Sequence, residues 1–305
     1  METSSAIPAG SRYGALAKAS FSVVVWGASF IATKMAVAEV SPVTVVWLRF
    51  AMGVAVLGAV VAARRQLAVP SRSDLGYFAL LGFLGIAFHQ WLQSNGLVTS
   101  QAGTTAWIVA STPVFMALLG WLILRERVRL MTVAGIALAA AGVVLVVSRG
   151  DLSAVAAGRF GAPGDLLILA SAPNWAVFSV LSRKGLQRHP SAVMMFWVMT
   201  LGWLMITVLW LLGPGPADVA HLSARGWGAI LFLGFACSGL AYVFWYDALR
   251  DLPASQVGAL LYVEPLIAVA VAAVLLGEPI VLATLLGGLA ILTGVWMVSL
   301  RPPGR

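Results

Sequence analysis

Charged residues are scarce in this chain: they make up 10% of its 305 residues, whereas hydrophobic residues make up 61%. An average soluble domain is about 25% charged, so this composition cannot build a water-facing surface and excludes a soluble globular protein. The chain has a single cysteine, Cys237, which excludes an intramolecular disulfide and a cysteine-built metal site. It falls in an apolar run, where we expect it to be a small packing residue.

Several chemical motifs are also missing. No GxxxxGK[ST] phosphate loop is present, so we do not expect ATP-driven transport by this chain alone. The histidines, His89, His189 and His221, are dispersed, so no metal or other cofactor is expected. The net charge of +8 lies in short clusters between apolar runs, which argues against a nucleic-acid partner. Because we find no catalytic constellation, we expect that the chain is not an enzyme.

What the chain does have is a series of long apolar runs. A membrane-spanning helix needs roughly 20 mostly apolar residues. Ten runs meet this requirement, with approximate cores at 15–37, 43–63, 75–97, 102–124, 130–148, 164–184, 191–212, 226–248, 254–276 and 280–300. The sequence therefore predicts an all-α integral membrane protein surrounded by lipid, with almost no residues left for a soluble domain.

The basic residues predict the orientation, because cytoplasmic loops of membrane proteins are enriched in Lys and Arg. With the N-terminus inside, most basic residues fall on the cytoplasmic side, and only Lys34, Arg149, Arg159 and Arg225 fall outside. We therefore expect a multi-pass protein of the cell inner membrane with both termini cytoplasmic. The first run, preceded by Arg12 and Lys18, is too long for a usual signal peptide, and nine more runs follow.

An internal repeat organises these runs. The stretch Gly82–Arg149 lies over Gly234–Arg301 at a constant offset of 152 residues, without gaps. Each half, roughly 12–149 and 160–301, holds five spans. Because five is odd, the second copy enters the bilayer in the opposite orientation. The predicted fold is thus ten transmembrane helices in two five-helix inverted-topology repeats, with each half as one domain.

Inverted repeats are typical of secondary transporters. Two copies of one bundle, related by a pseudo-two-fold axis in the membrane plane, can expose a midplane cavity alternately to each side of the membrane. This indicates a carrier of small molecules, although some channels also contain inverted repeats.

The motifs of the two halves carry a resemblance to a known family. They are Leu48-Arg49-Phe50, Pro113 with the run to Leu124-Arg125-Glu126, Glu264-Pro265 with the run to Leu276-Gly277-Glu278, and the paired glycines Gly135, Gly142, Gly287 and Gly294. The pattern resembles the EamA-like branch of the drug/metabolite transporter (DMT) superfamily, and the overall character is most similar to YddG-type exporters of aromatic and other amino acids. One departure is Arg125, where the second copy carries Gly277.

The resemblance implies a secondary transporter that exports amino acids, aromatic and other neutral ones, or related small metabolites by alternating access. We expect it to act as a monomer. A multidrug or quaternary-amine exporter is the nearest alternative, since an aromatic cavity with an acid would suit such substrates equally well. From other classes, a passive channel and a membrane-integral enzyme stay open.

Charges within the spans need an explanation, because each costs several kcal/mol unless it faces water or a partner. Glu264, directly before Pro265, either lines the cavity or serves as a structural acceptor; the first copy has the neutral Thr112 before Pro113. Arg49 is interpreted first as a structural ion pair or as a side chain that snorkels to the interface, with binding of a substrate carboxylate as the alternative. We assign structural or coupling roles to Arg49, Pro113, Pro265, Glu126 and Glu278.

Polar and aromatic side chains at helical spacing supply the candidate substrate site. His89 and Gln93 share one face of the third span, and Tyr242 and Tyr246 share one face of the eighth. At an offset of 148 residues Trp26 lies over Asn174, which places them on opposite sides of the pseudo-axis. The full candidate set is Trp26, Ser29, His89, Gln93, Trp107, Ser111, Asn174, Trp175, Tyr242, Tyr246, Tyr262 and Glu264.

Overall fold

A computed structural model describes residues 9–124, 130–157, 161–213, 215–252 and 254–299. Ten helices in these ranges are long and apolar enough to cross a membrane, which confirms the predicted fold class. They run over Arg12–Val37, Pro42–Ala63, Arg72–Thr99, Ala102–Leu119, Leu130–Ser148, Pro163–Leu186, Ser191–Leu212, Ala224–Asp251, Gln256–Leu276 and Leu282–Ser299.

The first five spans contain α1 (Ala9–Val37), α2 (Pro42–Ala63), α3 (Arg72–Gly82), η1 (Phe83–Phe88), α4 (His89–Thr99), α5 (Ala102–Val109), α6 (Thr112–Leu124) and α7 (Leu130–Ser148). A short α8 (Leu152–Ala156) follows. The last five contain α9 (Pro163–Leu186), α10 (Ser191–Leu212), α12 (Ala224–Leu231), η2 (Phe232–Leu240), α13 (Ala241–Asp251), α14 (Ala254–Ala259), η3 (Leu260–Val263), α15 (Glu264–Leu276) and α16 (Leu282–Ser299), with a short α11 (Gly215–Val219) after α10.

The outer surface of the bundle is apolar. Large side chains such as Leu209, Val274, Leu289 and Trp296 are more than half exposed. A soluble monomer rarely exposes contiguous apolar surface, whereas lipid-facing helices must. The protein is therefore a multi-pass membrane protein.

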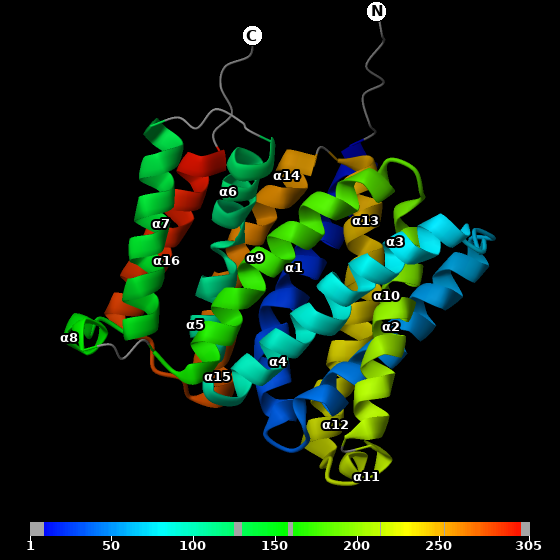
Figure 1. Ribbon diagram of the computed structural model, residues 1–305, viewed down its shortest axis with the longest axis horizontal. Coiled ribbons are helices and arrows are strands. Elements are labelled where there is room, and N and C mark those ends of the chain that lie inside the picture. The colour runs from blue at the N-terminus through cyan, green and yellow to red at the C-terminus, as the bar shows by residue number, and fades with distance from the viewer. Residues whose placement is uncertain (1–8, 125–129, 158–160, 214, 253, 300–305) are drawn as a thin grey trace, which may run out of the picture.

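The two repeats have opposite directions in the bundle. α1 begins and α16 ends on one side, drawn at the top of Figure 1, which we call the termini side; α8, α11 and α12 lie toward the opposite side. α7 and α16 pack along each other as an antiparallel pair at the edge of the molecule (Figure 1). These two helices are equivalent in the two repeats, so their antiparallel arrangement is that of inverted copies.

Glycines allow this pair to come close. A Cβ atom on Gly142 would lie 2.6 Å from the carbonyl oxygen of Gly287, and one on Gly135 would lie 2.7 Å from that of Gly294. The reverse contacts are equally tight, at 2.8 Å and 2.4 Å. At the offset of 152 residues Gly135 corresponds to Gly287 and Gly142 to Gly294, so each contact is the symmetry mate of the other. Small residues at such crossings let helix backbones approach within the membrane.

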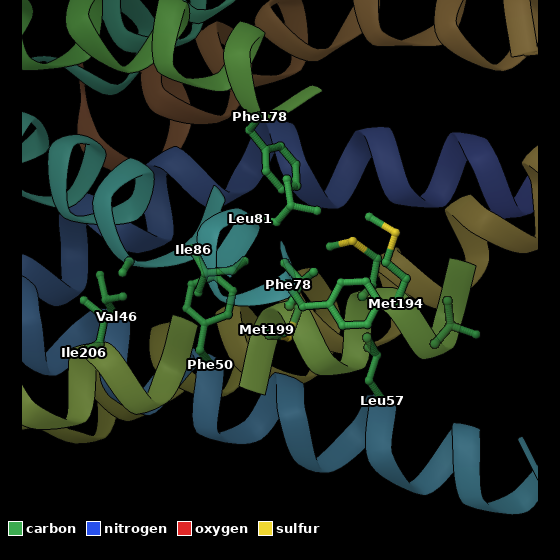
Figure 2. Packing of buried hydrophobic residues seen from close by; sticks show 14 residues of the cluster. Val46, Phe50, Leu57, Phe78, Leu81, Ile86, Phe178, Met194, Met199 and Ile206 are labelled. Carbon is green, nitrogen blue, oxygen red and sulfur yellow. The ribbon is translucent and has the colours of Figure 1, made fainter. Parts of the chain in front are cut away.

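The repeats are interleaved rather than side by side. α1 of the first repeat packs against α13 and α15 of the second, and α9 of the second packs against α4 and α6 of the first. A cluster of buried apolar side chains fixes α2, α3, η1 and α10 to one another; Phe50, Phe78, Ile86, Met194 and Met199 belong to it (Figure 2). The centre of the molecule is thus built by both repeats together.

Helix geometry is interrupted at equivalent places in both repeats. The third and eighth spans each contain a π-helical stretch, Phe83–Phe88 and Phe232–Leu240. The fourth span breaks between α5 and α6 just before Pro113, and the ninth contains the 3₁₀ turn η3 just before Glu264-Pro265. A proline has no N–H to donate, so it frees a carbonyl one turn earlier. Such interruptions inside a membrane are tolerated where protein or a cavity surrounds them.

Candidate functional site

Aromatic rings from both repeats meet in the middle of the bundle. The Trp26 ring on α1 lies edge-on to Tyr242 of α13, with centroids 5.6 Å apart, and 5.1 Å from Trp245. Tyr246 lies one turn beyond Tyr242, with centroids 6.5 Å apart. Neither tyrosine hydroxyl has a hydrogen-bond partner among the described residues, and both side chains are half-buried. They present donor and acceptor groups that a ligand can use.

A second aromatic group is also formed by residues of both repeats. The His89 ring on α4 is 5% exposed and lies 4.7 Å from the Trp175 ring on α9, which in turn lies 4.7 Å from Phe178. Trp175 and Tyr242 border the same apolar cluster. His89 Nδ1 is sealed from solvent and has no hydrogen-bond partner among the described residues.

Arg49 lies between the two aromatic groups. Its Nε donates to the Ser238 hydroxyl at 2.7 Å, one helical turn before Tyr242, and its Nη1 donates to Gln90 Oε1 at 3.2 Å, next to His89. The side chain is buried, yet none of the ion pairs among the described residues includes it. The structural ion pair favoured for Arg49 from sequence is therefore not present there.

The Glu264 side chain is free because, in the second repeat, a backbone N–H and not a side chain bonds the carbonyl that the proline leaves without a donor. In the first repeat the Thr112 hydroxyl donates to Val109 O, the carbonyl that Pro113 frees. In the second, the Glu264 backbone N–H bonds Leu261 O through a 3₁₀ turn. The Glu264 carboxylate is left without a hydrogen bond or ion pair among the described residues, and its backbone packs on Gly27, next to Trp26.

Trp26 and Asn174 occupy equivalent positions and make equivalent contacts. Trp26 Nε1 donates to Cys237 O, 3.1 Å away in the π-helical stretch of the second repeat. Asn174 Nδ2 donates to Leu84 O, 2.8 Å away in the π-helical stretch of the first. Each repeat thus supplies the donor for a carbonyl in the interrupted helix of the other. Asn174 is tied into the fold by this bond, while the Trp26 ring also faces the tyrosines.

The remaining candidate residues make other contacts. Trp107 is 1% exposed and packs against Gly288 of α16. The Ser111 hydroxyl, in the turn between α5 and α6, donates to Ile108 O of α5, and Tyr262 approaches Ser299 at the end of α16. Ser29 and Gln93 are buried and make no side-chain hydrogen bond with described residues. The structure thus brings together Trp26, His89, Trp175, Tyr242 and Tyr246, with Arg49 as their shared neighbour.

The two sides of the bundle are closed by different chemistry. On the termini side Asp247 of α13 accepts from Lys18 of α1 at 3.2 Å and from Arg64, at the end of α2, at 3.1 Å. Lys18 and Arg64 are 229 and 183 residues away from Asp247 along the chain, so no local sequence pattern pairs them with it. These ion pairs tie α1, α2 and α13 together on the termini side.

On the opposite side the closing contacts go to backbone groups. Lys34 donates to the carbonyls of Leu97 and Ser100, and Glu278 accepts from the N–H groups of Ala102 and Gly103 at 2.8 and 3.0 Å. Its first-repeat counterpart, Glu126, lies outside the described residues. A cavity of about 370 Å³ opens on this side, lined by Lys34, Met35, Ala38, Glu39, Gln101, Arg225, Leu276 and Glu278.

Metal binding has no support in the described part of the chain, where no group of three or more His, Cys, Asp or Glu side chains is placed to hold an ion.

The model of the EamA-like transporter family matches residues 15–148 and again residues 162–300. The chain belongs to the EamA-like transporter family. It is accordingly a membrane transporter of the DMT superfamily, as the motifs predicted.

Relatives of this EamA-like transporter span nearly its whole length. An uncharacterized transporter of Archaeoglobus fulgidus is 28% identical, over 92% of this chain and 96% of the relative. A probable terminal-alkyne amino-acid exporter of Streptantibioticus cattleyicolor is also 28% identical, over 93% and 92%. A probable amino-acid metabolite efflux pump of Salmonella typhimurium is 27% identical, over 90% and 91%. One crystal structure shares the fold, with a TM-score of 0.65 at 22% identity, over 94% of this chain and 98% of the other.

Proposed function

We propose that this transporter exports amino acids, aromatic and other neutral ones, from the cytoplasm. The observation that carries the proposal is the central group of Trp26, His89, Trp175, Tyr242 and Tyr246, in which both repeats contribute rings and two tyrosine hydroxyls have no hydrogen-bond partner among the described residues. Aromatic faces accommodate apolar side chains and attract ammonium groups, while hydroxyls bind carboxylates and amines. Two relatives named as amino-acid exporters support the same substrate class.

Transport would proceed by alternating access around this group. α1 and α9 each pack on helices of the other repeat, so a shift of one repeat against the other changes which side of the bundle is closed. We infer that the termini side is cytoplasmic, because Lys18, Arg64 and Arg250 gather there. The cavity beside Lys34 would then be the exit toward the outside. Reporter fusions at the two ends of the chain test this orientation.

Reconstitution into liposomes tests the proposed substrate. Proteoliposomes loaded with unlabelled phenylalanine should accumulate radiolabelled phenylalanine by exchange, saturably, and leucine should compete. Liposomes without protein and liposomes with Trp26→Ala protein are the controls; the variant should exchange at least several-fold more slowly. No saturable exchange of any amino acid would refute the proposal.

A second candidate is an exporter of quaternary or other organic amines. The specific observation in its favour is Glu264, a carboxylate inside a span with no cationic partner among the described residues. In the same proteoliposomes, saturable flux of a tetraalkylammonium dye that phenylalanine does not inhibit would favour this candidate over amino-acid export.

A further inference from the structure

Arg49 is a buried cation for which the described residues supply no counter-ion. It is 7% exposed, and its hydrogen-bond partners are the neutral Ser238 hydroxyl and the neutral Gln90 amide, while its Cζ lies 5.3 Å from the centroid of the neutral Phe50 ring. The titratable groups that interact with it electrostatically are His89, Cys237 and Tyr242, none of which is a carboxylate. A charge held inside a membrane protein without an opposite charge is costly, and such charges typically mark a ligand or ion path. A ligand anion would remove that cost.

The guanidinium also has donors to spare. An arginine carries five N–H donors, and its hydrogen bonds with the described residues use one on Nε and one on Nη1. In the described residues the side-chain atoms that are both sealed and unpartnered are His89 Nδ1 and Trp107 Nε1. Nη2 makes no hydrogen bond with the described residues and is not among these sealed atoms, so its two N–H groups reach accessible space. They are available to a carboxylate.

The two bonds it does make hold the guanidinium in a fixed direction. Gln90 comes from α4 of the first repeat and Ser238 from η2 of the second. Close packing supports this clamp: a Cβ atom on Gly53, one turn along α2 from Arg49, would lie 2.8 Å from Ser238 Cβ. A planar fork oriented in advance loses little entropy when it binds a planar carboxylate.

We propose that Arg49 binds the carboxylate of the transported amino acid. Tyr242 lies one turn beyond Ser238, and His89, which packs on Trp175, directly precedes Gln90, so aromatic rings lie near both residues that hold Arg49. An amino acid bound here places its carboxylate on the guanidinium and its side chain between aromatic rings. This assignment rests on the proposed function and deepens it: the substrate must carry a carboxylate, which excludes simple amines.

Equilibrium binding of a matched ligand set to purified protein tests the assignment. Phenylalanine, phenylalaninamide and 3-phenylpropionate share one ring; the second ligand lacks the carboxylate and the third lacks the amine. The wild type should bind phenylalanine about 10- to 100-fold more tightly than phenylalaninamide, as expected for hydrogen bonds to a charged group. Arg49→Gln should remove that preference while its affinity for phenylalaninamide stays within about threefold.

Two further variants complete the design. Arg49→Lys keeps the positive charge but not the planar guanidinium, and should retain part of the preference for phenylalanine over phenylalaninamide. This variant gives a result even where Arg49→Gln does not fold. Arg250→Gln removes an exposed arginine that pairs with neighbouring Asp251 and should bind all three ligands as the wild type does. An unchanged preference in both Arg49 variants, or an equal fall for all ligands, would overturn the assignment and leave amino-acid export standing. Wild-type binding of phenylalaninamide but not phenylalanine would overturn both.

Discussion

The two repeats share their scaffold and differ in their chemistry. Gly135 and Gly142 match Gly287 and Gly294 at the α7–α16 crossing, and both repeats interrupt the third and fourth of their spans at equivalent places. In contrast, Asp247 pairs with two cations where its counterpart, Asn95, bonds the Trp91 carbonyl of its own helix. Shared features make the inverted pair possible. We expect the features that differ to determine which substrate is bound.

Changing the shared glycine crossing should have the largest effect. In Gly142→Ala the new methyl group meets the Gly287 carbonyl at 2.6 Å, and backbone cannot move aside as a side-chain tip can. We expect a loss of about 1–3 kcal/mol of stability, measured as the fraction of folded protein after heating in detergent.

Symmetry sharpens this test. Gly294→Ala makes the symmetry-related contact, with the Gly135 carbonyl, and should cost about as much as Gly142→Ala. Gly76→Ala, in α3, is the control: outside its own helix no atom lies within 4 Å of its new methyl group, so helix propensity should make it neutral or slightly stabilising. Clearly unequal losses at Gly142 and Gly294 would show that the two symmetry-related contacts do not contribute equally to stability.

Asp247→Asn makes the second repeat resemble the first and should have the next largest effect. It removes the ion pairs with Lys18 and Arg64, whose side chains are 38% and 36% exposed. Solvent screens such pairs, so we expect a loss of about 1–2 kcal/mol rather than the full cost of breaking buried pairs.

Salt separates this effect from a packing defect. The melting temperature of the wild type should fall as ionic strength rises, and that of Asp247→Asn should depend on salt less. The matched control is Asp251→Asn, which removes only the exposed pair with Arg250 and should change stability by less than about 0.5 kcal/mol. Equal salt dependence in wild type and Asp247→Asn would contradict an ionic closure of the termini side.

Glu278→Gln weakens the opposite side and should have a smaller effect. The carboxylate accepts the Ala102 and Gly103 N–H groups at the start of α5, where helices favour negative charge. Glutamine keeps one acceptor, so we expect a loss of about 0.5–1 kcal/mol in the same heating assay. Glu278 makes no ion pair among the described residues, although it interacts electrostatically with Lys34, so this variant should change the salt dependence less than Asp247→Asn does.

The smallest effect concerns the corner between α1 and α2. Asp218 accepts the backbone N–H and the hydroxyl of Ser41 at 2.9 and 2.6 Å. Burial raises the pKa of Asp218, but the hydrogen bonds from Ser41 and Thr44 and the nearby His221 outweigh it and hold the pKa below its usual range. Because the folded pKa lies below the unfolded one, the stabilisation is full above pH ~4 and is lost as the pH falls through the folded pKa.

Asp218→Asn should therefore cost about 0.5 kcal/mol at pH 7, and the difference from wild type should shrink at lower pH. Melting temperatures of both proteins at pH 7, 5 and 3.5 give the comparison. A difference that grows toward low pH would have the wrong sign for this assignment. At the equivalent corner of the second repeat, His189 lies 3.3 Å from Asp74, so this variant leaves that corner untouched.

Hydropathy and the repeat were enough to predict the spans, because each lipid-crossing helix must satisfy its own backbone and face apolar surroundings. The predicted core 43–63, for example, matches the observed Pro42–Ala63. The π-helical stretches left no such signal, since a slip in hydrogen bonding leaves the apolar pattern unchanged. The prolines mark the interruptions in the fourth and ninth spans. They do not show that the freed carbonyl is bonded by the Thr112 hydroxyl in one span and within a 3₁₀ turn in the other.

Side-chain direction and distant pairing limited the site prediction. Residue type alone put Trp107 beside Trp26 in one candidate set, yet Trp107 packs on Gly288, and no local pattern shows which face of α5 meets α16. Arg49 was expected to have an anionic partner because buried charge is costly; the structure gives it Ser238, 189 residues away, and Gln90 instead. Such pairs depend on how the repeats interleave.

The glycine crossing has the form of an interface between two separate molecules. In a two-fold interface, residue i of one subunit contacts residue j of the other, and j contacts i. Gly135 with Gly294 and Gly142 with Gly287 satisfy this relation under the offset of the repeat, and their contact needs nothing from the covalent link between the halves. Two free copies of a five-helix subunit, inserted in opposite orientations, would meet here as a homodimer. Fusion then allows one copy to carry Asp247 while the other keeps Asn95.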